Sequence, residues 1–217
     1  MLSAILFDLD GTLANTDPLH FLTWKEILTQ FDLFIDEEFY NQRISGRVNE
    51  VIIKDILPQL SEKEGLELAE KKEAQFRELA HNLEPMTGLM RLLDWSKSRQ
   101  IKQAVVTNAP RKNAEFMLNA LRLKKIFPIL ILAEEAPKGK PDPAPYQLAL
   151  ERLGVSASEA IAFEDSPSGV RSATGAGIFT IGVNSTHDSN YLLEAGAKWV
   201  IKDFSSSQLW EWLQQFY

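Results

Sequence analysis

Six short runs of apolar residues, many of them β-branched, recur along the chain. They cover residues 4–7, 101–107, 129–132, 160–163, 178–183 and 199–201. Most of these runs are almost continuously apolar, which is typical of strands that are covered on both faces. We therefore expect six buried strands.

Helical spacing of apolar residues appears between these runs. It covers residues 88–97, 111–121, 144–153 and 169–176. Strands that alternate with helices favour a parallel sheet in an α/β domain. Near the end of the chain, Leu209, Trp210, Leu213 and Phe216 are spaced for one helical face, for which we predict a packing role and not a ligand site.

Four of the expected helices begin beside a proline. Asp17, Asp142 and Ser166 each precede a proline directly, as an N-cap residue does when proline takes the first helical position, and residues 108–110 follow this scheme more loosely. The N-terminus of a helix presents unpaired N–H groups and the positive end of the helix dipole. These helix starts are therefore suited to anions.

A long helical stretch interrupts the alternation of strands and helices. Helical patterns cover residues 18–31, 36–43, 47–57 and 61–83, and the last of them is strongly charged and amphipathic. No convincing strand lies among them. We therefore predict a helical insertion over residues 17–83, within an α/β domain formed by residues 1–16 and 84–217.

The composition is that of an ordinary globular protein. Of the 217 residues, 45% are hydrophobic and 24% are charged, and the length fits one domain with an insertion. The 23 basic and 30 acidic side chains give a net charge of −7, which disfavours binding to nucleic acid. The absence of cysteine excludes disulfides, thiolate nucleophiles and thiolate metal sites, and it fits a reducing, cytoplasmic compartment.

A membrane partner is not expected either. No apolar run approaches the roughly 20 residues that span a bilayer. The apolar residues 1–7 lack the basic segment that opens a signal peptide. The oligomeric state stays open, because apolar positions serve cores and interfaces alike.

Two carboxylates follow the first expected strand. Because side chains alternate along an extended backbone, Asp8 and Asp10 lie on one side of the chain and Leu9 on the other. Gly11 then allows a sharp turn. The pair fits acid and base chemistry, but it fits equally a turn in which both aspartates bind local N–H groups.

A second pair, Glu164 and Asp165, follows the fourth expected strand. Ligands of open α/β sheets bind at the carboxyl ends of the strands. If the first and fourth strands are neighbours, four carboxylates converge beside Lys140, leaving a charge of about −3 that requires protons or a metal. Oxygen ligands favour magnesium over zinc. The alternative is a solvated acidic loop.

Two further segments carry groups that suit an anion. Thr107 and Asn108 end the second expected strand, where a hydroxyl and backbone N–H groups can hold a phosphate, although an ordinary helix cap has the same appearance. Lys140 lies in a proline-containing loop before a helix. Lysines in such loops are commonly just solvated, but a stiff loop also suits a pre-positioned charge.

In this order, the four clusters resemble the motifs of the haloacid dehalogenase-like hydrolase superfamily. The first motif is matched by Asp8-Leu9-Asp10-Gly11-Thr12, the second by Thr107, the third by Lys140 and the fourth by Glu164-Asp165-Ser166. The resemblance covers nearly the whole chain. It implies a Rossmann-like three-layer α/β/α core with a parallel sheet, and it identifies the insertion over residues 17–83 as an α-helical cap.

The resemblance also implies a mechanism. Asp8 would be the nucleophile that becomes an aspartyl phosphate, and Asp10 would protonate the leaving oxygen and then activate water. Mg²⁺ would bind Asp8, the backbone carbonyl of Asp10, and Asp165, with Glu164 nearby or acting through water. An acid–base aspartate at Asp10 argues against a dehalogenase.

The remaining motif residues would surround the transferring phosphoryl group. By the same resemblance these are Thr107, the N–H of Asn108, and Lys140, which would stabilise charge on its oxygens.

The expected cap resembles the branch that contains β-phosphoglucomutase and small sugar-phosphate phosphatases. His20, Trp24 and Gly46 have counterparts there, and Arg47 is placed to contact a substrate. The plainer alternatives are packing between cap helices for His20 and Trp24 and a surface charge for Arg47, as for Arg43.

Two cap positions separate a phosphatase from a mutase. The mutase pattern has lysine just before Gly46 and arginine three residues after it, whereas this chain has Ser45 and Asn49 there. We therefore favour a magnesium-dependent phosphatase that acts on a small phosphorylated metabolite. The alternatives are a sugar phosphomutase, a phosphorylatable module resembling a response-regulator receiver, and a catalytically silent binding protein.

Overall fold

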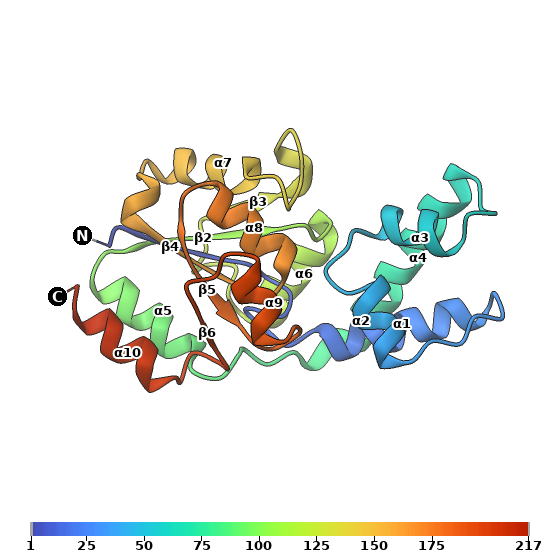
Figure 1. The fold of residues 1–217 in the computed structure, drawn as a ribbon, viewed down its shortest axis with the longest axis horizontal. Helices are drawn as coiled ribbons and strands as arrows, with labels where there is room; N and C mark the ends of the chain where they lie inside the picture. Colours follow the sequence, from blue (N-terminus) through green and yellow to red (C-terminus); the bar gives the residue numbers. More distant parts are fainter. Residues whose placement is uncertain (1, 217) are drawn as a thin grey trace. The chain divides into compact units, whose positions relative to one another are not determined.

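The computed structural model describes residues 2–216, which divide into two compact units. One unit comprises residues 2–15 and 84–216, and the other comprises Thr16–Leu83 (Figure 1). Within residues 2–216, every helix is too short or too polar to cross a membrane. The roles of catalytic core and cap that the sequence predicts for the two parts remain predictions.

The larger unit is built on a six-stranded sheet in the order β3-β2-β1-β4-β5-β6. Its strands are β1 (Ala4–Phe7), β2 (Lys102–Thr107), β3 (Ile129–Leu132), β4 (Ala160–Glu164), β5 (Phe179–Val183) and β6 (Trp199–Ile201). All neighbouring strands pair in parallel. The predicted parallel α/β sheet is therefore confirmed. The chain adds β2 and β3 on one side of β1 and then β4 to β6 on the other, so the strand order reverses beside β1.

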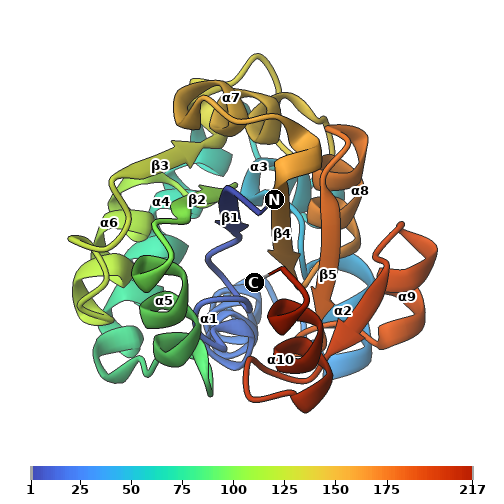
Figure 2. The same ribbon diagram turned by 90° about the vertical axis from the view of Figure 1, so that its left-hand side faces the viewer.

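Helices cover both faces of this sheet, as the Rossmann-like prediction requires (Figure 2). They are α5 (Leu89–Ser98), α6 (Arg111–Ala120), α7 (Ala144–Leu153), α8 (Pro167–Gly175), α9 (Ser189–Glu194) and α10 (Ser207–Gln214), with short 3-10 turns at Ala133–Glu135 and Ala157–Glu159. Helix α7 packs on β2 and β3, and α8 packs on β4 and β5. Helices α5 and α10 lie side by side on the opposite face.

The central strands β1 and β4 bury both of their faces, as their continuous apolar runs predict, whereas the edge strands β3 and β6 are partly exposed. All four residues of β1 are buried. Leu6 belongs to the cluster that includes Tyr146 and Ala149 of α7. Phe7 instead stacks on Phe163 of β4, with ring centroids 5.5 Å apart. The centre of the sheet is therefore fixed from both sides, which holds the strand ends that follow in place.

The packing role predicted for the last helix is confirmed. Leu209, Trp210 and Leu213 of α10 are buried. The indole of Trp210 meets that of Trp95 on α5 edge to face, with ring centroids 6.2 Å apart. Phe216 lies beyond the helix, against the ring of Trp212, with centroids 4.8 Å apart.

One of the three predicted proline-linked N-caps is confirmed, and two are wrong. The Ser166 side chain caps α8 by accepting a hydrogen bond from the Gly169 N–H. Asp17 is instead the first residue of α1, because its carboxylate accepts hydrogen bonds from side chains elsewhere in its unit. Asp142 precedes the cap position of α7, although its side chain still accepts from the Ala144 N–H at 3.0 Å. Helix α9 was not predicted, because its six residues are too few to show helical spacing.

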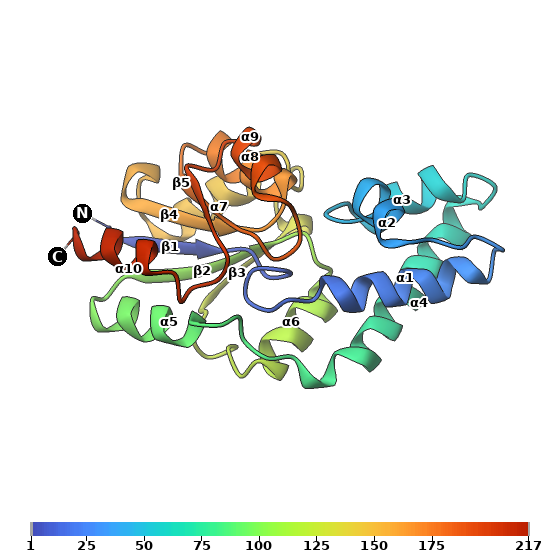
Figure 3. The ribbon, with the colours of Figure 1, turned by 60° about the horizontal axis from the view of Figure 1, so that its bottom comes forward.

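The smaller unit, Thr16–Leu83, consists of helices and connecting turns (Figure 3). Its helices are α1 (Asp17–Thr29), α2 (Glu37–Arg43), α3 (Asn49–Ile56), α4 (Glu62–Leu79) and the 3-10 turn Ala80–Asn82. Helix α4 packs against α1 and α3. Trp24 is 1% exposed within the core of this unit, so the packing interpretation of Trp24 is confirmed.

Candidate active site

The first aspartate lies at the carboxyl end of β1. Asp8 is 7% exposed, and its N–H donates to the Phe163 carbonyl at 3.0 Å, which ties it to β4. The chain then turns at Gly11, whose φ is +73°. A side chain at Gly11 would place its Cβ 2.1 Å from Oδ2 of Asp165. Only glycine allows both this turn and this close approach.

Three carboxylates meet at this edge of the sheet. Because β1 and β4 pair in register, Asp8 and Glu164 leave neighbouring strand ends together, and Asp165 follows directly. One carboxylate oxygen from each of these three residues lies within 4.8 Å of the other two. We call this group the carboxylate cluster. Asp10 is half-buried and is not one of these three residues, but its charge adds to the raised pKa of Asp8, so the convergence of four carboxylates stays a prediction.

Lys140 supplies the cation of the cluster. Its Nζ lies 2.5 Å from Oδ1 of Asp8 and 2.5 Å from Oε1 of Glu164, and it also donates to the Val106 carbonyl at 2.7 Å. The residue is 8% exposed, so the interpretation as a solvated loop lysine is wrong. Asn108 anchors the loop, because its side chain bonds both the N–H and the carbonyl of Lys140.

Burial and neighbouring charges both shift the pKa values of Asp8 and Lys140. Burial raises the pKa of Asp8 to about 8, and although Lys140 counteracts this shift, Glu164 adds to it. Burial alone would lower the pKa of Lys140, but Asp8 and Glu164 raise it above its usual value. Lys140 therefore stays charged. This one ammonium pairs with two of the three carboxylates, so the cluster attracts a proton or a further cation.

Thr107 ends β2 beside this group. It is 2% exposed, and its Oγ1 accepts a hydrogen bond from the Ala109 N–H at 2.9 Å. The alternative of an ordinary helix cap at Thr107 is wrong, because Pro110 is the cap residue of α6 and Thr107 instead closes a local turn before that helix. Because the oxygen acts as the acceptor, the hydroxyl proton can still be donated to another group.

The residues of the smaller unit that we predict to contact the substrate lie in two segments, helix α1 and the connection between α2 and α3. The ring of His20, on α1, stacks on that of Phe76 with centroids 4.1 Å apart. Gly46 lies in the turn between α2 and α3 with φ of +72°. Arg47 follows it, and its guanidinium binds Asp55 at 2.9 Å in an exposed ion pair. The contacts of His20, Gly46 and Arg47 with a substrate remain predictions.

A buried polar network in the smaller unit was missed from the sequence. Lys72 is 2% exposed, and its Nζ lies 2.8 Å from Nδ1 of His20 and 2.9 Å from Oε1 of Glu73. Asn49 donates to the same oxygen of Glu73 at 2.5 Å. Burial alone would raise the pKa of Glu73, but Lys72, His20 and Asn49 together lower it. Nothing in the highly charged sequence of α4 distinguishes Lys72 from its exposed neighbours.

Tyr146 on α7 was also missed. Its hydroxyl donates to Oε1 of Glu164 at 2.7 Å, and its side chain is fully buried. Burial raises the pKa of this phenol well above its usual value, and the neighbouring Glu164 adds to the shift, so Tyr146 stays a neutral donor. In the sequence it is one apolar position of an amphipathic helix, with no sign of a polar partner.

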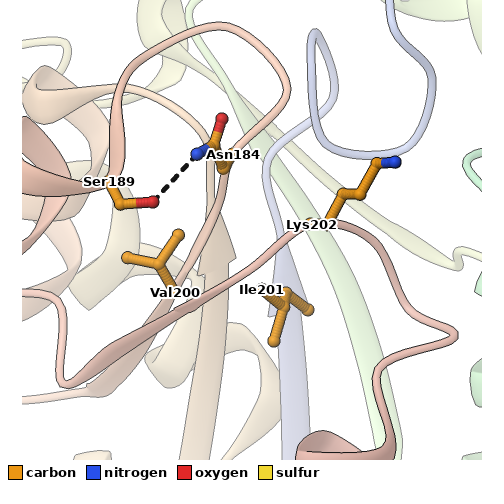
Figure 4. A pocket seen from close by; sticks show the side chains of 5 residues that line it. All are labelled: Asn184, Ser189, Val200, Ile201 and Lys202. Carbon is orange, nitrogen blue, oxygen red and sulfur yellow. Dashed lines mark hydrogen bonds between the residues drawn. The ribbon is translucent and has the colours of Figure 1, made fainter.

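A cavity of about 370 Å³ lies at the ends of β5 and β6. Its lining residues are Asn184, Ser189, Val200, Ile201 and Lys202. Figure 4 shows the amide of Asn184 bonded to the Ser189 hydroxyl, a contact of 2.8 Å, with the Lys202 side chain directed away from both. None of the predicted site residues lines this cavity.

Comparison with known proteins agrees with this geometry. The sequence model of the haloacid dehalogenase-like hydrolases matches residues 5–183. The chain belongs to this family. The match begins in β1 and ends at the last residue of β5, so it includes all four motifs and the helical unit between the first and second of them.

Named relatives of this haloacid dehalogenase-like hydrolase include phosphatases and mutases. A phosphorylated carbohydrates phosphatase of Thermotoga maritima is 35% identical over 205 residues, which cover 93% of this chain and 94% of the relative. A β-phosphoglucomutase of Bacillus subtilis is 31% identical over 191 residues, which cover 84% and 83%. The protein is therefore an enzyme of this family, similar to sugar-phosphate phosphatases and to phosphoglucomutases.

The fold has a close counterpart among solved structures. A haloacid dehalogenase-like hydrolase of family IA, variant 3, from Entamoeba histolytica superposes with a TM-score of 0.87 at 30% identity, covering 96% of this chain and 97% of the other. The agreement extends over both compact units, and it supports assigning the chain to this family.

Proposed function

We propose that this protein is a magnesium-dependent phosphatase that acts on a small phosphorylated metabolite, such as a sugar phosphate. The observation that carries the proposal is the buried Lys140 ammonium, held 2.5 Å from Asp8 within the carboxylate cluster at the strand ends. This arrangement places a nucleophilic carboxylate beside a fixed positive charge. The relative in Thermotoga maritima, which is named a phosphatase, supports the same reaction.

The residues of the carboxylate cluster suit Mg²⁺. They offer only oxygen ligands, which magnesium prefers. Oε2 of Glu164 is buried and has no hydrogen-bond partner within residues 2–216, so one ligand oxygen is not used by the protein. Asp8, Asp165 and the backbone carbonyl of Asp10 would hold the ion, with Glu164 beside them. The ion would neutralise charge on the phosphoryl oxygens.

The reaction would proceed in two displacements. Asp8 attacks phosphorus and forms an aspartyl phosphate, while the bond to the leaving oxygen breaks and Asp10 gives that oxygen its proton. Asp10 then takes a proton from water, which attacks phosphorus and releases inorganic phosphate and free Asp8. Lys140, the Thr107 hydroxyl and the Asn108 N–H stabilise the phosphoryl oxygens in both steps.

The helical unit would select the substrate. In this proposal His20, Gly46 and Arg47 contact the part of the substrate that carries no phosphate. The place of a mutase arginine is taken by Asn49, which donates to Glu73 within the buried network. This contact supports a phosphatase over a mutase.

A panel of phosphorylated metabolites tests the proposal. We expect magnesium-dependent release of inorganic phosphate from one compound well above the others, and no release by Asp8→Asn. A hexose 1-phosphate in the panel separates the alternatives, because a mutase yields the isomeric monophosphate. A long-lived phosphoaspartate without turnover would instead identify a receiver-like module.

Magnesium activation is expected to weaken as the pH falls. Burial raises the pKa of Asp8 to about 8, so below that pH a proton competes with the ion for this carboxylate. The Mg²⁺ concentration for half-maximal activity should rise about tenfold from about pH 7 to about pH 6. Phosphate release titrated with MgCl₂ at each pH measures this, and a constant half-maximal concentration would contradict it.

Removing the hydroxyl of Thr107 should slow the reaction. Thr107→Ala is expected to lower kcat by about 10² to 10³-fold, because it deletes one donor to the phosphoryl oxygens. Steady-state kinetics at saturating Mg²⁺ measure the change, with Thr107→Ser as the control that keeps the hydroxyl. An unchanged kcat in the alanine variant would leave Thr107 with only its local hydrogen bond to the Ala109 N–H.

A further inference from the structure

Tyr146 is a buried polar residue that the proposed mechanism does not use. It lies on α7 within an otherwise apolar cluster that includes Leu6, Ala149 and Ala162. Phenylalanine would fill the same space without bringing a polar atom into this cluster. The hydroxyl is therefore tolerated because it has a partner, which is Oε1 of Glu164 at 2.7 Å.

Glu164 is confined from two sides. Its Oε1 accepts hydrogen bonds from both Tyr146 and Lys140. On its other side the carboxylate lies against the backbone of Gly169, where an added Cβ would come within 1.9 Å of Oε2. The Tyr146 hydroxyl and the Gly169 backbone together fix where this carboxylate lies.

The position of Glu164 in turn directs Lys140. An ammonium group has three N–H donors, and Lys140 directs one to Asp8, one to Glu164 and one to the Val106 carbonyl. The Val106 carbonyl belongs to β2 and cannot move independently of the sheet. Because Glu164 is one of the three acceptors that set the position of the ammonium, a shift of Glu164 changes where the ammonium lies relative to Asp8.

We propose that Tyr146 is a positioning residue of this enzyme: its hydroxyl holds Glu164 in place, and Glu164 keeps the Lys140 ammonium on Asp8. This inference rests on the proposed phosphatase function, because the effect on Lys140 is measured at the transferring phosphoryl group. Tyr146 itself contacts neither the substrate nor Asp8 in this scheme.

The first test replaces Tyr146 with phenylalanine. In Tyr146→Phe we expect kcat at saturating Mg²⁺ to fall about tenfold, the effect of losing one hydrogen bond to a charged group, with KM unchanged. Thr180→Val is the matched control, because Thr180 is also fully buried and its hydroxyl donates to the Ile178 carbonyl at 3.0 Å. The control should lose stability but keep the parent kcat.

A double-mutant cycle separates positioning from a general loss of packing. If Tyr146 acts through Glu164, Tyr146→Phe should cause little further loss of kcat in a Glu164→Gln background. Multiplicative effects of the two substitutions would overturn the proposal, and so would a parent-like kcat in Tyr146→Phe alone.

A crystal structure of Tyr146→Phe provides a readout that does not depend on turnover. We expect the Lys140 ammonium to lie beyond hydrogen-bond distance of Asp8, and an ammonium that stays bonded to Asp8 would contradict the inference. If the parent enzyme releases no phosphate, the proposed function fails, and the crystal structure still decides the role of Tyr146. If the parent is active and the variant equals it, only the inference about Tyr146 fails.

Discussion

Replacing Asp8 with asparagine is expected to abolish phosphate release, lowering kcat by about 10⁴-fold or more. The amide of asparagine is a poor nucleophile, so the first displacement cannot proceed at a useful rate. The fold should persist, because the amide oxygen can still accept from Lys140 and the substitution removes one of three clustered negative charges. Phosphate release and thermal unfolding of the same preparation measure the two effects.

The activity of Asp8→Asn can be interpreted only if the variant is folded. A circular dichroism spectrum and a melting temperature close to those of the parent show that lost activity is chemical. Retention of more than about a tenth of the parent kcat would exclude Asp8 as the nucleophile. An asparagine cannot form the aspartyl phosphate, so such activity would have to come from another nucleophile.

Replacing Lys140 with methionine should affect both activity and stability. The substitution leaves the three carboxylates of the cluster buried without their ammonium. Removing one partner of a buried ion pair costs about 3–5 kcal/mol, so we expect the free energy of unfolding to fall by about that amount. We expect kcat to fall by about 10³-fold, because the fixed positive charge at the phosphoryl group is lost.

Chemical denaturation and steady-state kinetics of Lys140→Met test this expectation. Lys138→Met is the matched control, because Lys138 lies in the same loop and is exposed. The control should unfold at the parent denaturant concentration and keep the parent kcat. Equal behaviour of the two variants would mean that the ammonium of Lys140 is neither structural nor catalytic.

Much of the fold could be predicted because it depends on local patterns. The apolar runs of β1, β2 and β4 mark buried strands, and the apolar spacing in α7 marks a helix that packs on them. The meeting of Asp8 and Glu164 also follows from the sequence, because the carboxyl ends of neighbouring parallel strands meet at one edge. The burial of the loop residue Lys140 beside them, in contrast, could not be predicted.

The remaining features depend on contacts that local sequence does not encode. Asp17 is of a residue type that commonly caps helices and stands before a proline. Its carboxylate instead accepts a hydrogen bond, at 2.7 Å, from the hydroxyl of Tyr40, which is 23 residues away in the chain. The extended backbone expected to carry Asp8 and Asp10 ends at Phe7, and Asp10 instead forms an isolated bridge with Ala14 around the turn at Gly11. Tyr146 and Lys72 look like members of ordinary helix faces, and only the tertiary structure gives them polar partners.

Because β1 pairs with β4, the candidate site can form only late in the synthesis of the chain. Lys140 and Asp8 are 132 residues apart, and Glu164 follows later still. During synthesis β1 therefore leaves the ribosome long before the strand and the ammonium that complete its site. Closing such long loops is slow, so partly folded chains keep their acidic groups apart. Phosphate-ester hydrolysis should consequently appear only after β4 has paired with β1, and chains that end before Glu164 should be inactive.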